Sequence, residues 1–514
     1  MMLAQLRGRV GAPCATGRNC RPPQTPATAP RRPLRTSIVP AAASVDEAAS
    51  EAARAGIDWS ADRRSSQGEA STSGQEQGFD YDAPAWVRER NAVFAKQLEG
   101  KLVLAPLTKG GNVPFRRLCL HFGAEVTMSE MAFSKPLLKG DRVERARLYK
   151  APGEQMFGFQ VACKTISDGI AASKLAKEGG AQFLDINCGC PIYEATRRGM
   201  GSAMLRKPRA LAKMVAGIAA DSELPVTVKI RLGENDKKIV VDTVVDYLHR
   251  AGAAAVTVHG RTAEQRYKKA ADWAKVGEVA RSTPVPIIGN GDILTHYEAH
   301  ARRAESGCAA VMAGRGALIK PWIFQEYKEG REWLPTTAER VGVYRLLVSY
   351  MKEHFGDDER GWRKAWYFFP WHFDFLTRYR PLPEAVYGSA SREHPLIMTR
   401  MDLTDARVGE EGPEALGWAE RLLRCEHPEA HEAIAAALWD AGSDADVMVA
   451  LERIGQEHVA AWEEAVRAGG RGGDAARGGG LGVGGPAGGA EGEGREGGKR
   501  GRGSRNDDAE LERG

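Results

Sequence analysis

The sequence of 514 residues lacks the features that mark several classes of protein. No apolar stretch approaches the ~18 residues that a membrane-spanning helix needs, so we expect no membrane partner. The eight cysteines are scattered, without the framework of a secreted disulfide-rich domain or the paired spacing of a zinc site. We therefore expect reduced thiols and no metal site.

Acidic residues are missing from the first 45 positions, which are rich in Arg, Ala, Pro, Thr and Ser. This composition predicts a transit peptide over 1–45, directed to the plastid, with the mitochondrion and the cytoplasm as alternatives. Residues 46–95 are rich in acidic and polar residues and predict a disordered linker. Glycine dominates 469–514, which predicts a disordered tail.

Short apolar runs recur between these ends, and each is followed by a polar or glycine residue and then by a helix-like stretch. They are 101–105, 124–127, 156–161, 182–186, 226–230, 255–258, 285–288 and 309–313. Strands that alternate with helices indicate a parallel sheet of βαβ units. Eight of them in about 220 residues predict an α/β fold, a TIM (β/α)8 barrel over 96–325.

Polar groups follow these predicted strands, and a barrel would bring them to the one face where such enzymes build their active sites. The residues are Pro106, Ser129, Glu130, Gln160, Asn187, Lys229, His259, Asn290, Gly291, Asp292, Gly314 and Arg315. Cys190 belongs to this set, because an apolar run stops at Asn187 and presents the thiol just before Pro191. The alternative reading of Cys190 alone is a small buried hydrophobe.

A smaller α-helical domain is predicted over 326–468. Its stretch 362–380 mixes aromatic with basic residues, which can stack bases and hold phosphates. We expect most of the aromatic side chains to pack the helices, so the Arg and Lys residues are better candidates for a nucleic-acid surface. The net charge of +5 is compatible with such an anionic partner.

The chain resembles the tRNA-dihydrouridine synthase family over about residues 100–325. The matching segments are 104–108 (LAPLT), 114–117 (PFRR), 129–131 (SEM), 157–160 (FGFQ), 187–191 (NCGCP), 228–231 (VKIR), 258–262 (VHGRT), 289–292 (GNGD) and 314–316 (GRG). Segments 264–267 (EQRY), 271–273 (ADW) and 317–322 (ALIKPW) are similar to the eukaryotic branch that modifies uridine 47.

The resemblance implies an oxidoreductase that acts on a CH–CH bond and reduces C5=C6 of a specific uridine in tRNA. No side chain supplies a hydride, and the family uses FMN reduced by NADPH. It implies that Cys190 is the general acid and that Asn187 and Arg261 bind the substrate. The implied FMN-binding residues are Pro106, Leu107, Thr108, Gln160, Lys229, His259, Asn290, Gly291, Asp292, Gly314 and Arg315. We expect a monomer that binds tRNA and NADPH.

Two other functions stay open at this point. The chain could be a flavin oxidoreductase of a free pyrimidine or another small molecule, against which the helical region and segment 264–267 argue. It could also be a tRNA-binding protein without catalytic activity. The presence of Cys190, Lys229 and His259 argues against that alternative.

Overall fold

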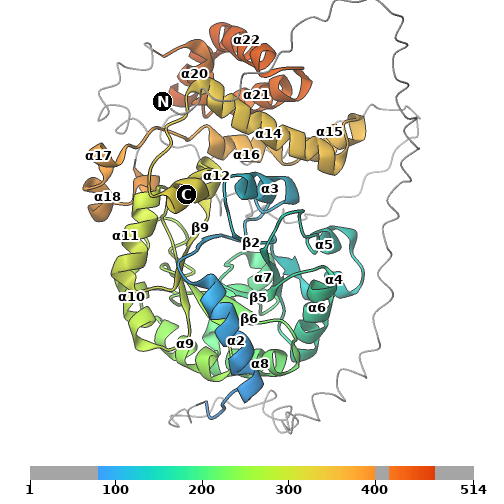
Figure 1. Ribbon diagram of the computed structural model, residues 1–514, viewed down its shortest axis with the longest axis vertical. Coiled ribbons are helices and arrows are strands. Elements are labelled where there is room, and N and C mark those ends of the chain that lie inside the picture. Colours follow the sequence, from blue (N-terminus) through green and yellow to red (C-terminus); the bar gives the residue numbers. More distant parts are fainter. Residues whose placement is uncertain (1–78, 400–415, 469–514) are drawn as a thin grey trace, which may run out of the picture. The chain divides into compact units, whose positions relative to one another are not determined.

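In the part of the chain that the structure describes, nine parallel strands form the centre (Figure 1). The computed structural model describes residues 79–399 and 416–468. The strands are β1 (Leu102–Leu104), β2 (Val126–Met128), β3 (Ala132–Phe133), β4 (Met156–Ala162), β5 (Phe183–Cys188), β6 (Val226–Arg231), β7 (Ala255–His259), β8 (Ile287–Asn290) and β9 (Ala310–Ala313).

The sheet closes into a barrel because β1 pairs with β9 and β2 pairs with β4. Strand β3 pairs with the later part of β4, through Ala132 opposite Val161, so β2 and β3 together occupy one barrel position. The predicted eight-stranded barrel is therefore confirmed. Strand β3 was not predicted, because it is only two residues long.

Helices surround the barrel and extend into a second, helical region (Figure 1). Those of the barrel are α2 (Ala85–Leu98), α3 (Val113–His121), α4 (Ser134–Leu138), α5 (Arg142–Ala146), α6 (Ile166–Glu178), α7 (Tyr193–Thr196), η3 (Gly201–Arg206), α8 (Pro208–Asp221), α9 (Val241–Arg250), α10 (Trp273–Ser282), α11 (His296–Ser306), α12 (Arg315–Ile319) and α13 (Ile323–Glu329). The helical region contains α14 (Thr337–Phe355), α15 (Glu359–Trp366), α16 (Phe369–Leu376), α17 (Glu384–Tyr387), α18 (Ala390–Glu393), η4 (Leu396–Met398), α20 (Trp418–Leu423), α21 (Pro428–Asp440), α22 (Asp444–Ile454), η6 (Gly455–Val459) and α23 (Ala460–Ala468).

Helix α2 lies where the sequence predicted the end of a disordered linker. Its Phe94 and Leu98 are buried among apolar side chains of the barrel strands, and the Phe94 ring lies 5.2 Å from that of Phe183 in β5. These side chains fill the barrel interior beside the beginnings of the strands. The prediction failed here because only a few apolar positions in a polar segment carry the packing.

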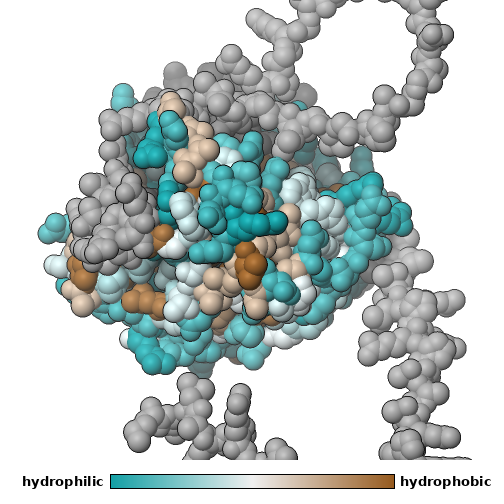
Figure 2. All heavy atoms as spheres, turned by 90° about the horizontal axis from the view of Figure 1, so that it is seen from above, coloured by the Kyte–Doolittle hydropathy of each residue, from teal (hydrophilic) through white to brown (hydrophobic). Residues whose placement is uncertain are grey.

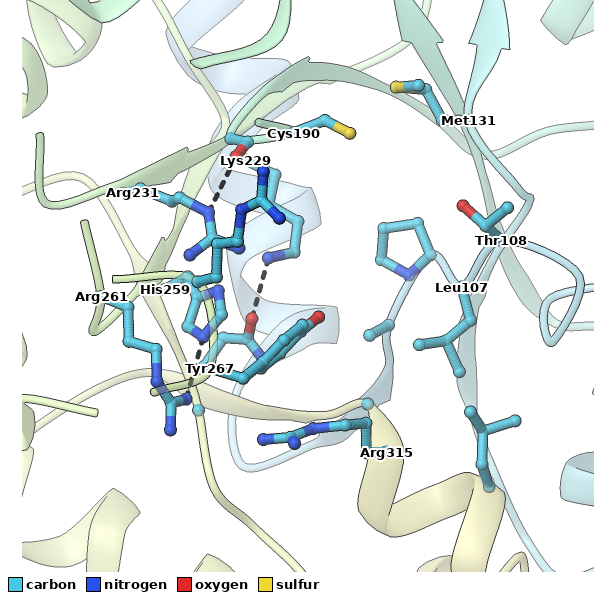
Figure 3. A pocket seen from close by; sticks show the side chains of 18 of the residues that line it. Leu107, Thr108, Met131, Cys190, Lys229, Arg231, His259, Arg261, Tyr267 and Arg315 are labelled. Atoms are coloured by element: carbon cyan, nitrogen blue, oxygen red, sulfur yellow. Dashed lines mark hydrogen bonds between the residues drawn. The ribbon is translucent and has the colours of Figure 1, made fainter. Parts of the chain in front are cut away.

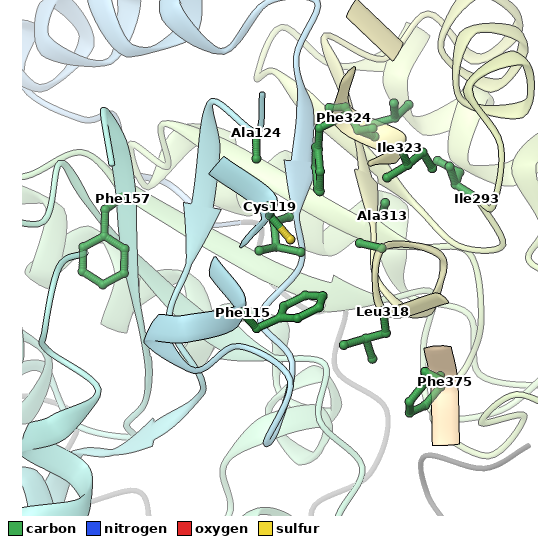
Figure 4. Close-up of a cluster of buried hydrophobic side chains, with 14 of the residues drawn as sticks. Phe115, Cys119, Ala124, Phe157, Ile293, Ala313, Leu318, Ile323, Phe324 and Phe375 are labelled. Atoms are coloured by element: carbon green, nitrogen blue, oxygen red, sulfur yellow. The ribbon is translucent and has the colours of Figure 1, made fainter. Parts of the chain in front are cut away.

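The helical region packs on the barrel through α14 against α3 and α16 against α12. Figure 4 shows Phe115 of α3, Leu318 of α12 and Phe375 of α16 in one apolar cluster. Most aromatic residues of the stretch 362–380 pack the helices, as expected; Trp362 lies 4.4 Å from Trp366 and 5.1 Å from Trp439, ring centre to ring centre. Arg380 is buried and donates to backbone carbonyls, so it is not a surface residue.

The face of the molecule shown in Figure 2 is mainly hydrophilic, and its hydrophobic residues form small separate patches. Within residues 79–399 and 416–468, no helix is both long and apolar enough to cross a membrane. The predicted transit peptide, most of the predicted linker and the glycine-rich tail lie outside the described residues and remain predictions.

A buried ion pair fixes α3 to the barrel beside the strand ends. Arg116 Nε lies 2.7 Å from Glu154 Oε1, and both side chains are almost fully buried. Thr127 of β2 donates a 2.7 Å hydrogen bond to the same carboxylate, and Arg116 also donates to the carbonyl of Gly111. The pair therefore supports both the sheet and the loop after β1.

We expect Glu154→Gln to lower the free energy of unfolding by about 3 kcal/mol, because it leaves the Arg116 charge buried without its partner. Urea denaturation measures the change. Glu359→Gln is the matched control, since Glu359 and Arg363 form an ion pair with both side chains more than 70% exposed. Loss of this exposed ion pair should lower the free energy of unfolding by no more than about 0.5 kcal/mol. Equal effects of the two substitutions would contradict this account.

Candidate active site

One pocket lies at the carboxyl ends of the barrel strands (Figure 3). The predicted catalytic, cofactor-binding and substrate-binding residues all line it, namely Pro106, Leu107, Thr108, Gln160, Asn187, Cys190, Lys229, His259, Arg261, Asn290, Gly291, Asp292, Gly314 and Arg315. Ser129 and Glu130, which were also predicted at this face, are not among its lining residues. The helical region adds Trp371, Phe375 and Ile397. Residues from across more than two hundred positions therefore converge because parallel strands end on one face.

The turn after β5 presents Cys190 to this pocket. The Asn187 side-chain oxygen accepts hydrogen bonds from the backbone N–H groups of Gly189 and Cys190, at 3.3 and 2.9 Å. The Cys190 carbonyl accepts one from Ser202 N at 2.9 Å. Gly201 is required beside it, because its φ is +61° and a Cβ there would lie 2.4 Å from that carbonyl oxygen.

Cys188 points in the opposite direction. Its side chain is fully buried and its sulfur lies 3.7 Å from that of Met204, whereas Cys190 is partly exposed and lines the pocket. Burial raises the pKa of the Cys188 thiol well above its ordinary value. Of the two neighbouring cysteines, only Cys190 is placed to meet a ligand.

Cationic side chains form the wall of the pocket after β6 to β9. Lys229 Nζ donates a 2.8 Å hydrogen bond to Asn290 Oδ1, and Arg231 donates to the carbonyls of Gly189 and Thr262. Arg261 lies 2.7 Å from Asp292 Oδ2, with both side chains fully buried, and Arg315 lies 3.4 Å from Asp292 Oδ1. This arrangement concentrates positive charge, which suits an anionic ligand.

The electrostatics of the pocket follow from this concentration. Burial lowers the pKa of Lys229 to about 8, and neighbouring Arg231 adds to the effect. The pKa of His259 lies well below its ordinary value, mainly because the ring is buried and in addition because Arg231 and Lys229 are positively charged. The imidazole is therefore neutral at pH 7. His259 therefore acts as a neutral hydrogen-bonding group in the pocket.

Strained backbone borders the pocket. Within the described residues, Lys109, Arg266 and Asp292 are the non-glycine residues with a left-handed backbone, at φ of 59°, 47° and 51°. Arg266 and Asp292 line the pocket, and Lys109 follows Thr108. Such conformations cost free energy and cluster at functional sites.

Four further residues of the site were not predicted from the sequence, namely Tyr267, Arg231, Asp185 and Trp371. The Tyr267 ring projects into the pocket, with the Arg315 guanidinium 4.1 Å from its centre (Figure 3). Trp371 comes so close to the loop after β1 that a Cβ on Gly110 would lie 2.6 Å from its ring. Two of them left a signal in the sequence: Asp185 is an acidic residue in the middle of an apolar strand, and Arg231 follows Lys229 by two residues.

The donor set suits an organic anion with a flat ring better than a metal ion. Within residues 79–399 and 416–468, no group of three or more His, Cys, Asp or Glu side chains could hold a metal. Leu107 and Met131 instead lie on the side of the pocket opposite the cations, and Pro106 adds to the apolar lining. These features fit a flat-ringed ligand that carries an anionic group, and Gln160 and Asn187 add polar groups to the lining.

Comparison with known protein families agrees with this geometry. Residues 103–379, more than half of the chain, match the family model described as "Dihydrouridine synthase (Dus)". The chain belongs to the dihydrouridine synthase family. The resemblance inferred from the sequence motifs is thereby confirmed, and the match extends through the barrel to just past the end of α16.

Curated members of this family are similar to the chain over its central part. A human protein named "tRNA-dihydrouridine(47) synthase [NAD(P)(+)]-like" is 40% identical over 63% of this chain and 51% of its own length. A rice protein of the same name is 36% identical over 66% of this chain and 50% of its own. The chain thus spans about half the length of these relatives.

We expect the stability difference between Lys229→Met and the wild type to depend on pH. Lys229 has a folded-state pKa of about 8, below its ordinary value of 10.5, so its burial costs stability at pH 7. That cost is relieved as pH rises from 8 towards 10.5, because the folded state then releases its proton first. Lys229→Met should therefore be more stable by about 1–3 kcal/mol at pH 7.

This advantage should shrink by pH 10. Urea denaturation of both ligand-free proteins between pH 7 and 10 measures the trend. A difference that does not change with pH would show that Lys229 is not desolvated in the folded protein.

Proposed function

We propose that this protein reduces the C5=C6 bond of a uridine in tRNA, with a flavin that NAD(P)H reduces. The observation that carries the proposal is the position of Cys190, whose thiol borders the same pocket as the cationic wall of Lys229, Arg231 and Arg315. The family match supports the reaction class. The names of the relatives make position 47 the first uridine to examine.

FMN is the flavin that we propose. When bound, it supplies the hydride that no side chain can supply. Arg315 and the glycine-rich backbone at Gly291 and Gly314 would hold its phosphate, because an Arg guanidinium pairs well with phosphate oxygens. Lys229 would face the polar edge of the ring and stabilise the negative charge of its reduced form.

Cys190 would complete the reduction by donating a proton to C5 of the uracil ring. Its half-buried position excludes much of the solvent, and the backbone hydrogen bonds to Asn187 hold the turn in place. One Asn187 N–H donates to Gln160, so the second is left for the base, and Arg261 of the pocket lining is the other residue that we propose for the substrate. The uridine must leave its stack to reach this depth.

A basic groove supports RNA as the substrate rather than a free pyrimidine. It lies beside the active site, between α4, α5 and the loops after β4 and β5, and is lined by Lys135, Lys139, Arg142, Lys164 and Arg198. Its carboxylates are already engaged, Asp141 by backbone N–H groups and Asp168 by Ser134. Arg198 follows α7, the short helix after the Cys190 turn, so the segment after β5 contributes residues to both the pocket and the groove.

The reaction tests the assignment of Cys190. With FMN and NADPH, the purified wild type should form dihydrouridine in unmodified tRNA, and Cys190→Ala should keep its flavin but slow the reaction about 10²–10⁴-fold, because C5 lacks its proton donor. Mass spectrometry of digested tRNA measures the product. Cys188→Ala is the matched control, since its thiol faces the core. Normal product formation by Cys190→Ala, or a slower Cys188→Ala, would show that the acid lies elsewhere.

Binding of RNA should depend steeply on salt, and the basic groove should account for part of that dependence. Replacing Lys135 and Lys139 together by Glu should weaken tRNA binding and reduce the slope of log K against log salt by about 1–2. Lys96→Glu on α2, at the other end of the barrel, should leave the slope unchanged. If the double variant binds tRNA like the wild type, the RNA does not use this groove. If the wild-type protein reduces free uridine as well as it reduces tRNA, the small-molecule alternative holds.

A further inference from the structure

A buried carboxylate lies directly below the pocket and takes part in none of the steps described above. Asp185 of β5 is fully buried and stands in register with Gln160 of β4 and Thr227 of β6. Its Oδ2 accepts a 2.8 Å hydrogen bond from Gln160 Nε2, and its Oδ1 accepts a 2.6 Å hydrogen bond from Thr227. Gln160 Oε1 in turn accepts a 2.9 Å hydrogen bond from Asn187 Nδ2.

These bonds form a chain from Asp185 through Gln160 and Asn187 to the Cys190 turn. We propose that Asp185 is a positioning residue, which fixes the orientation of both amides and so holds the Cys190 thiol at the pocket. An ionised carboxylate only accepts, so Gln160 must turn its NH₂ group towards Asp185 and its oxygen towards Asn187. Asn187 must then donate to Gln160 and turn its own oxygen to the backbone N–H groups of Gly189 and Cys190.

The orientation of the two side-chain amides is thus set consistently from both ends of this series of hydrogen bonds. Backbone N–H groups can only donate, and they demand the Asn187 oxygen; the carboxylate demands the Gln160 nitrogen. If Asp185 were apolar, Gln160 would lose its anchor and could rotate, and the hold on the Asn187 amide would weaken. The Cys190 turn would then open more often.

The cost of this carboxylate supports a functional reason for its presence. Burial raises the pKa of Asp185 to about 6, against the lowering effects of Thr227, Gln160 and Lys229. Because the folded-state pKa lies above the ordinary value of 3.8, the protonated form stabilises the fold, and that contribution is lost as pH rises through about 6. At pH 7 the charge therefore costs stability, which packing alone would not require.

The test measures the reactivity of the thiol and does not need the proposed reaction. Iodoacetamide should alkylate Cys190 about tenfold faster in Asp185→Leu than in the wild type, because loss of about 1.4 kcal/mol of hydrogen bonding opens the turn. Mass spectrometry of the peptides follows Cys190 and, as an internal control, the buried Cys188. Dihydrouridine formation should fall about 10–100-fold, since small misplacements of a reacting group are costly.

Three variants separate positioning from general damage. Asp185→Asn can still accept from Gln160 and donate to Thr227, so it should alkylate like the wild type. Thr227→Val removes a hydrogen-bond donor to Asp185 that does not lie between Asp185 and Cys190, so it should also leave the alkylation rate of Cys190 unchanged. If Asp185→Leu does not fold, Gln160→Leu cuts the same chain one residue later and should speed the alkylation of Cys190.

Unchanged alkylation of Cys190 in the folded Leu variant would overturn the proposal, and so would equal acceleration of Cys188 and Cys190. This inference rests on the proposed function for its consequence in catalysis. The proposed function and the role of Asp185 fail in different ways. A wild type that forms no dihydrouridine would refute the function, whereas the alkylation result alone decides the role of Asp185.

Discussion

The concentration of positive charge at one end of a closed barrel is the constraint on which the site depends. Parallel strands bring Lys229, Arg231, Arg261 and Arg315 to one wall, and Asp292 contacts two of them. Desolvation lowers the pKa values of Lys229, Arg231 and Arg315, so each charge is held at a cost. A bound anion would relieve that cost, and the pocket therefore has a physical reason to bind one.

The barrel interior changes in character along its axis. Apolar side chains, with Phe94 and Leu98 of α2, fill the end where the strands begin. Above them lies a polar layer of Gln160, Asp185 and Thr227, and above that layer the pocket with Cys190 and Lys229. The first layer is apolar, whereas the upper layers hold buried polar and charged groups, and strained backbone borders the pocket.

Much of this arrangement was predictable from the sequence because it depends on local patterns. Apolar runs with a polar residue at the end predicted eight strands, and the barrel then brought Cys190, Lys229 and Arg315 together. Side-chain pairing was not predictable, since it depends on register: Asp185 reads as one polar residue in an apolar strand until Gln160 and Thr227 lie beside it. Trp371 belongs to a stretch whose aromatic side chains were mostly expected to pack the helices, and its place in the pocket follows from the packing of α16 on α12.

Comparison of FMN with riboflavin tests the central claim most directly, because the two ligands share the ring and differ in the phosphate. If the cationic wall binds the phosphate, the purified protein should bind FMN about 100-fold more tightly, as expected of two charge-assisted hydrogen bonds of about 1.5 kcal/mol each. The difference should diminish in Arg315→Ala. Equal affinity for the two flavins, measured by fluorescence quenching, would contradict the account of this pocket.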